Sequence, residues 1–213
     1  MEVNLVSITH PRINNIETPE DLIAYCARVS NPSNQFNTET APKLLGYLIK
    51  HKHWSPYEMV DMCLEIKTSR AIAAQILRHR SFSFQEFSQR YSNATQLEDI
   101  EWRLQGKTNR QVGDDPTQLD TELSNSISLH LDNALELYNS LIEKGVAKEC
   151  ARMILPLTTE TTMYMKGSIR SWIHYIDLRS KEDTQKEHRE IALKCREIFV
   201  NNFPSTSKAL EWV

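Results

Sequence analysis

The stretch EMVDMCLEIKTSRAIAAQILRHR, residues 58–80, carries the two patterns that decide the fold. Over 58–67, apolar residues alternate with mostly polar ones, which is typical of a strand with one buried face. From 70 to 80, the alanine and leucine content favours a helix that Ser69 can cap, and neither glycine nor proline interrupts it. We therefore expect a half-buried strand that leads directly into a helix with a basic end.

Further helices and strands are expected on both sides of this stretch. Periodicity and capping residues predict a strand at 3–8, helices from about 19 and at 40–51, 116–144, 146–155, 168–179, 184–202 and 206–212, and a strand at 158–165. The apolar stripe of the longest helix consists of Leu123, Ile127, Leu131, Leu135 and Tyr138. Long helices and non-adjacent strands indicate an α+β fold, with residues 1–213 as one domain and the polar segment 92–115 as an excursion from it.

Composition excludes several classes of protein. The 213 residues have a net charge of -3, which gives no general reason to expect nucleic acid as a partner. No apolar run approaches a membrane span, and the first residues lack a secretory signal, so we expect a cytoplasmic protein with no membrane partner. The cysteines show no C-x-x-C spacing and are expected to be reduced core residues; they are Cys26, Cys63, Cys150 and Cys195.

Positive charge is concentrated in QILRHRSFSFQEFSQRY, residues 75–91. On a helix, Gln75 shares a face with Arg78 and His79. If 84–90 is extended, Ser88 and Arg90 point to the same side as Glu86 and meet the helical face at one turn. The five glycines form no phosphate-binding loop, so arginine and serine side chains would have to hold any nucleotide phosphate.

Three interpretations of this basic segment stay open on spacing alone. The arginines suit a nucleotide phosphate, but they equally suit a solvated helix end on a helical interaction scaffold. The interleaved aromatic residues also suit an RNA-binding module, in which they would stack on single-stranded bases. The many acidic residues of the chain argue against the RNA-binding interpretation.

The same segment resembles the signature of the flavin-dependent thymidylate synthases. The resemblance rests on Arg78-His79-Arg80 followed by Ser88 after seven residues, with Ser83, Glu86, Arg90 and Tyr91 in place. Outside the signature, it rests on His53-Trp54-Ser55-Pro56-Tyr57-Glu58, on Glu149-Cys150-Ala151-Arg152, and on Arg170, His174, Leu178-Arg179, Gln185 and Glu187. The family usually has asparagine where this chain has Gln85 and Ser168.

The resemblance implies a single α+β domain with long helices and an antiparallel sheet. It also implies a flavoprotein methyltransferase that makes dTMP from dUMP, with methylenetetrahydrofolate as carbon donor, FAD as redox cofactor and NADPH as reductant. Members of the family form homotetramers with active sites shared between subunits, and they use no metal. These properties are expectations from similarity.

Individual roles follow from the same resemblance. Arg179 is the expected catalytic residue, because a guanidinium can stabilise negative charge on the uracil ring. The expected dUMP contacts are Gln75, Arg78, Glu86, Phe87, Ser88, Gln89, Arg90, Arg152 and Arg179. The expected FAD contacts are His53, Ser55, Arg78, His79, Arg80, Glu86, Ser168, Arg170 and His174.

Ordinary structural roles exist for several of these residues. Arg179 also suits the C-terminus of a helix, and Arg152 could form a surface ion pair with Glu149. A helix over 168–179 would place Arg170 and His174 on a polar face opposite an apolar one. No metal site is expected at His51, His53 and Glu58, because further ligands are not apparent, and Cys150 is expected to be a core thiol rather than a nucleophile.

Overall fold

The centre of the molecule is a four-stranded antiparallel sheet in the computed structural model, which describes residues 1–93 and 96–213. Its strands, in spatial order, are β1 (Glu2–Ile8), β2 (Asp61–Ser69), β6 (Glu160–Ser168) and β3 (Ser83–Glu86). The two central strands pair without a shift, from Asp61 opposite Ser168 to Ser69 opposite Glu160. The prediction of an α+β fold with an antiparallel sheet is therefore confirmed.

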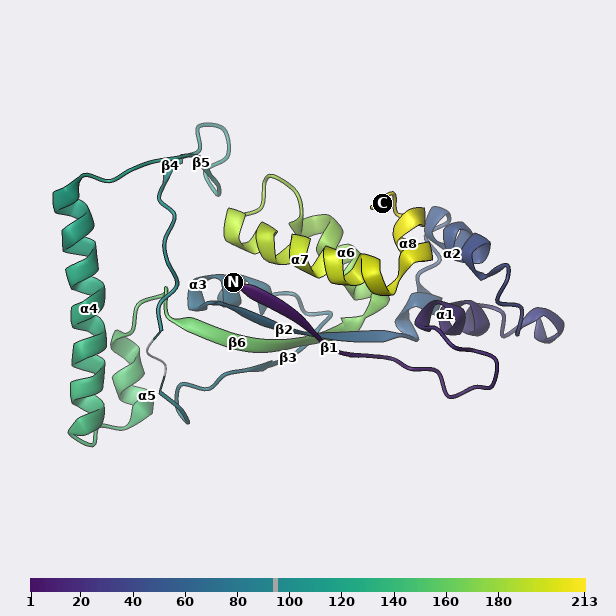
Figure 1. The fold of residues 1–213 in the computed structure, drawn as a ribbon, viewed down its shortest axis with the longest axis horizontal. Coiled ribbons are helices and arrows are strands. Elements are labelled where there is room, and N and C mark those ends of the chain that lie inside the picture. The colour runs from purple at the N-terminus through teal and green to yellow at the C-terminus, as the bar shows by residue number, and fades with distance from the viewer. Residues whose placement is uncertain (94–95) are drawn as a thin grey trace.

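Alternation along the central strands buries one face of the sheet. Met62, Leu64 and Ile66 of β2 are fully buried, as are Met163 and Met165 of β6, and the residues between them are more exposed. Helices α6 (Ile169–Arg179) and α7 (Lys186–Asn202) lie over this face (Figure 1). Burial of these apolar side chains is the main source of stability here, at roughly 1.5 to 3 kcal/mol for each large residue.

Helix α6 is fixed on the sheet by close packing beside β6. Trp172 is fully buried and donates a hydrogen bond from Nε1 to the carbonyl oxygen of Met62 at 2.9 Å. The Phe82 ring lies so close to Gly167 that a Cβ on this glycine would meet it at 2.5 Å. A larger residue at 167 would displace the ring, so this glycine allows the turn after α3 to reach the start of α6.

The remaining helices are α1 (Pro19–Ala27), η1 (Pro32–Asn34), α2 (Ala41–Lys50), η2 (Ser55–Glu58), α3 (Arg70–Ile76), α4 (Thr121–Glu143), α5 (Lys148–Ala151), η3 (Arg152–Ile154) and α8 (Pro204–Ala209). Of these, α1 and α4 are capped by side chains as expected, whereas Ser69 stands at the start of α3 without a side-chain cap hydrogen bond. Thr18 forms a capping box with Asp21, and Asp120 accepts a hydrogen bond from the backbone of Leu123. Gly145 has a φ of 78° just after α4, which is the conformation that favours glycine there.

Helix α4 stands at one end of the molecule, away from the helices that cover the sheet (Figure 1). Of its predicted apolar stripe, only Tyr138 is fully buried, whereas Leu123 is 47% exposed. Leu129 and Leu137, which lie outside that stripe, are 62% and 59% exposed. The helix therefore presents an apolar surface that the described residues leave exposed.

Two predicted elements around the basic segment are shorter than expected. Helix α3 ends at Ile76 instead of 80, because the backbone N–H of His79 bonds to the carbonyl of Ile76 in a tighter turn. Strand β3 ends at Glu86 instead of 90, and a turn closed by Tyr91 N–H and the Ser88 carbonyl follows. The prediction that Gln75 shares a helical face with Arg78 and His79 is therefore wrong. The prediction that the chain is extended from 84 to 90 is also wrong.

The predicted excursion contains regular structure. Strands β4 (Arg103–Gln105) and β5 (Gly113–Pro116) form a hairpin, so the long helix begins at Thr121 rather than near 116. Positions 94 and 95 of the predicted excursion lie outside the described residues. All four cysteines are free, but only Cys195 is a buried core residue; Cys26 and Cys63 are half-buried and Cys150 is exposed, which corrects their prediction as core thiols.

Candidate active site

Arg179 lies at the centre of a cluster of aromatic and amide side chains. We call it the histidine cluster, and its members are Gln75, His79, Tyr175, Arg179 and His188. Arg179 donates from Nε to Nε2 of His79 at 2.9 Å, and the His79 ring packs edge-on against Tyr175 at 4.9 Å. His188 is fully buried, with Nε2 3.2 Å from the Tyr175 hydroxyl. The last residue of α6 is thus held by the turn that follows α3.

Both histidines of the cluster are neutral at pH 7. Burial, together with the charges of Arg179 and Arg78, lowers the pKa of His79 to about 4. Burial, together with Arg179 and His79, lowers the pKa of His188 to about 3. Because Arg179 donates to Nε2 of His79, the proton of that imidazole resides on Nδ1. A neutral acceptor therefore fixes the orientation of the Arg179 guanidinium.

The low pKa of His188 predicts that the protein loses stability in mild acid. The unfolded chain takes up a proton near pH 6.5, whereas the folded chain does so only near pH 3, so stability falls as pH drops through this window. At pH 5 this histidine alone should lower the free energy of unfolding by about 2 kcal/mol relative to pH 7. Urea unfolding of wild type and His188→Gln at the two pH values measures this contribution. Equal pH dependence in both proteins would contradict it.

A second group of predicted residues gathers where η2 meets α6. His53 and Ser55 are exposed at η2, and His174 on α6 packs edge-on against Trp54 with ring centroids 4.9 Å apart. Arg170 forms an ion pair with Glu58 at 2.6 Å. The polar face predicted for this helix is confirmed, since Ile169, Trp172, Ile173 and Ile176 are buried on the other side. Ser168 is its N-cap and accepts from the Ser171 backbone at 3.3 Å.

The environment of this second group also favours a neutral imidazole. Partial burial lowers the pKa of His174, and the charge of Arg170 lowers it further, against an opposing effect of Asp177. The four predicted FAD contacts of this group are thus His53, Ser55, Arg170 and His174, drawn from two elements that touch. The contacts between the two elements are made by Trp54 with His174 and by Glu58 with Arg170.

The third group of predicted residues follows β3. Glu86 accepts hydrogen bonds from Arg70 at 2.8 Å and from the Thr161 hydroxyl at 3.0 Å, so Arg70 is a partner that sequence reasoning missed. Ser88 and Arg90 are exposed, while Gln89 is buried and Phe87 is half-buried. Within the described residues, no hydrogen bond or ion pair joins this group to the histidine cluster. The predicted dUMP contacts therefore fall into two sets that share no such bond in the described part of the chain.

Several donors in and around the third group form no hydrogen bond or ion pair in the described part of the chain. Nε2 of Gln89 and Nε of Arg152 are buried and have no hydrogen-bond acceptor in the described part of the chain. Arg78, Arg80 and Arg90 are exposed, and among residues 1–93 and 96–213 no carboxylate forms an ion pair with any of them. Gln89 and Arg152 can therefore each donate to a further acceptor.

The sequence comparisons identify the family. A family model described as thymidylate synthase complementing protein matches residues 13–205. The chain is also 53% identical over 220 residues to a probable flavin-dependent thymidylate synthase of Paramecium bursaria Chlorella virus 1, with all of both chains covered. It is 52% identical over 217 residues to a flavin-dependent thymidylate synthase of Synechocystis sp., again with both chains fully covered.

The chain belongs to the flavin-dependent thymidylate synthase family. This confirms the resemblance predicted from the signature and the interpretation of the chain as an enzyme. A more distant member of the family, from Thermus thermophilus, is 35% identical over 191 residues, which cover 89% of this chain and 70% of the relative. The residue roles that the resemblance implied remain predictions.

The family signature did not reveal every residue that shapes these groups. His188 was missed, although its spacing from Ile191, Ala192, Cys195 and Phe199 places it on the buried stripe of α7. A histidine in such a stripe must find buried partners, and this could have indicated the cluster.

The predicted ion pair between Arg152 and Glu149 is not formed among the described residues. Within the same ranges, no group of histidine, cysteine, aspartate or glutamate is arranged to hold a metal ion.

Proposed function

We propose that the chain catalyses the reductive methylation of dUMP to dTMP. Methylenetetrahydrofolate supplies a methylene group and NADPH supplies a hydride, so the C5–H of uracil becomes C5–CH3. The C5 proton and one proton from solvent complete tetrahydrofolate, and NADP+ leaves. FAD, when bound, carries the electrons from NADPH to the carbon that is transferred. The proposal rests on the family and on one structural observation: the exposed signature arginines Arg78, Arg80 and Arg90 form no ion pair with a carboxylate among the described residues.

The residues that would bind FAD fit an elongated, anionic, ring-containing group. The guanidiniums of Arg78 and Arg80 are exposed and have no carboxylate partner in the described part of the chain, so they are available for a pyrophosphate. The imidazoles of His53 and His174 are also exposed and can contact a flat ring. Ser55, His79, Glu86, Ser168 and Arg170 complete the proposed set.

The residues that would bind dUMP divide into a phosphate set and a ring set. Ser88 and Arg90 are exposed after β3 and suit the phosphate dianion, with Arg152 and Gln89 offering the buried donors described above. Arg179 would stabilise negative charge on the uracil edge with the Nη groups that His79 leaves free. Gln75 and Arg78 would hold the same ring, with Glu86 and Phe87 beside the phosphate set.

We propose a homotetramer in which one subunit supplies the histidine cluster and another the phosphate set. Two observations support sharing of the site. The two sets share no hydrogen bond or ion pair among the described residues, and α4 exposes Leu123, Leu129 and Leu137 beside the short helices that carry Arg152. Apolar surface of this kind is typical of subunit interfaces. We further propose that residues 1–213 act as one domain.

A cytoplasmic location is proposed with this function, in keeping with the free thiols of all four cysteines. In the described part of the chain, no helix combines the length and apolar character needed for a membrane span.

The visible spectrum of the purified protein tests the proposal. We expect absorbance bands of bound FAD, release of FAD on denaturation, and a change in the bands when dUMP is added, because the uracil ring would lie against the flavin. Uridine without a phosphate at equal concentration serves as the ligand control. A colourless protein that cannot be reconstituted with FAD, or salt-sensitive binding of oligonucleotides with no response to dUMP, would contradict the proposal.

A further inference from the structure

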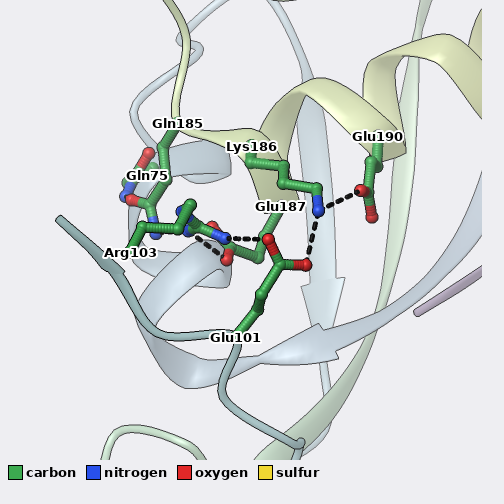
Figure 2. A network of polar contacts seen from close by, with 7 residues as sticks. All are labelled: Gln75, Glu101, Arg103, Gln185, Lys186, Glu187 and Glu190. Carbon is green, nitrogen blue, oxygen red and sulfur yellow. Dashed lines mark hydrogen bonds and ion pairs between the residues drawn. The ribbon is translucent and has the colours of Figure 1, made fainter. Parts of the chain in front are cut away.

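The β4–β5 hairpin contributes a charged residue to the surroundings of the histidine cluster. Arg103 of β4 reaches the N-terminal end of α7, where its Nη2 lies 2.5 Å from Oε1 of Glu187 (Figure 2). Its side chain is only 13% exposed, and Nη1 lies 3.4 Å from the Glu101 carboxylate. Lys186 also contacts Glu101, so two cation–carboxylate contacts hold the hairpin against α7.

Glu187 begins a continuous series of hydrogen bonds that ends in the cluster. Its Oε2 accepts from Nε2 of Gln185 at 2.9 Å, and Oε1 of Gln185 accepts from Nε2 of Gln75 at 2.6 Å. Oε1 of Gln75 lies 3.3 Å from Nδ1 of His188, whose Nε2 faces the Tyr175 hydroxyl. Figure 2 shows the two amides side by side beneath the start of α7.

The carboxylate of Glu187 sets the direction of every bond in this series. A carboxylate only accepts, so Gln185 must turn its amide N–H2 toward it and its oxygen toward Gln75. Gln75 then donates through nitrogen and receives the Nδ1 proton of neutral His188 through oxygen. Although burial raises the pKa of Glu187, hydrogen bonds from Arg103 and Gln185 lower it overall, so the carboxylate stays ionised.

We propose that Arg103 is a positioning residue that fixes the amide of Gln75 for dUMP by holding Glu187 ionised and in place. The proposal rests on the proposed function, in which Gln75 contacts dUMP. It also gives the hairpin within the 92–115 excursion a role that the family signature does not indicate. Without Arg103, the half-buried carboxylate loses its cation and both amides can rotate away from the orientation that they share.

The first test compares Arg103→Gln with Arg110→Gln in the FAD-bound protein. Arg110 lies on the same hairpin, is exposed, and forms no side-chain hydrogen bond or ion pair among the described residues. Titration with dUMP, followed by the flavin spectrum, should show a dissociation constant raised about 5- to 10-fold in Arg103→Gln. It should be unchanged in Arg110→Gln. An unchanged value for Arg103→Gln, with wild type binding dUMP, overturns this inference but not the proposed function.

A second test separates positioning from general loss of structure. In a Gln75→Ala background, Arg103→Gln should change dUMP affinity by less than twofold, because the amide on which it acts is gone. The same 5- to 10-fold loss in both backgrounds overturns the proposal. Arg103→Lys should recover part of the affinity, because it retains the charge without the planar fork.

Should Arg103→Gln fail to fold, Glu187→Gln tests the same series with almost no change in volume. Its amide can donate as well as accept, so the direction of the bonds is no longer fixed. We expect a similar loss of dUMP affinity with little change in thermal midpoint. Wild-type affinity in this variant overturns the proposal, whereas absence of dUMP binding in the wild-type protein would refute the proposed function itself.

Discussion

Replacing Arg179 with alanine is expected to lower the rate of dTMP formation by a factor on the order of 100 to 1,000 while FAD remains bound. The proposed role of this guanidinium is to stabilise negative charge on the uracil ring, and its Nε is already committed to His79 at 2.9 Å. The geometry is therefore fixed before the substrate arrives. Single-turnover methylation, with bound FAD quantified by absorbance, measures the two effects separately.

Arg179→Lys is the matched control for charge. A lysine ammonium keeps the positive charge but cannot donate to His79 and to a ring edge from one planar group, so it should restore only a small part of the rate. In Arg179→Ala, the pKa values of His79 and His188 should both rise, since the arginine charge lowers each of them. Histidine titration by NMR reports this change. Wild-type turnover in Arg179→Ala would refute its catalytic role.

The elements with strong periodicity could be predicted from the sequence, but their ends near the site could not. The alternation in β2 and the two faces of α6 follow from local pattern and were found at nearly the expected places. Helix-favouring residues continue past Ile76, yet α3 stops there in a tighter turn, after which Phe82 packs against Gly167 and Trp172. Tertiary context of this kind routinely overrides local propensity, and it leaves no signal in a window of ten residues.

In the site, too, residues close together in sequence could be predicted, whereas contacts between residues far apart in sequence could not. The signature arginines stand close together in sequence and could be identified from their spacing. The contact of Arg103 with Glu187 joins residues 84 positions apart and could not be predicted, because no local pattern records it. The partner of the exposed apolar residues of α4 is likewise not encoded in the pattern of that helix alone.

Replacing Arg90 with alanine is expected to weaken dUMP binding by about 10- to 150-fold, which corresponds to the 1.5 to 3 kcal/mol of one charged hydrogen-bonding partner. Arg90 is exposed, lies two residues after the equally exposed Ser88, and pairs with no carboxylate in the described residues. Its charge is therefore available to a phosphate. Titrations of the FAD-bound variant and wild type with dUMP measure the loss.

Deoxyuridine, which has no phosphate, distinguishes the loss of a phosphate contact from a loss of affinity that does not involve the phosphate. If Arg90 holds the phosphate, Arg90→Ala should bind deoxyuridine as wild type does, so that the preference for the nucleotide over the nucleoside shrinks by the same 10- to 150-fold. Arg12→Ala is the control for net charge, because Arg12 is exposed and also lacks an ion pair among the described residues. Its dUMP affinity should stay within twofold of wild type. Equal losses for both ligands in Arg90→Ala would place Arg90 at the base or sugar instead, and no loss for either would remove it from the site.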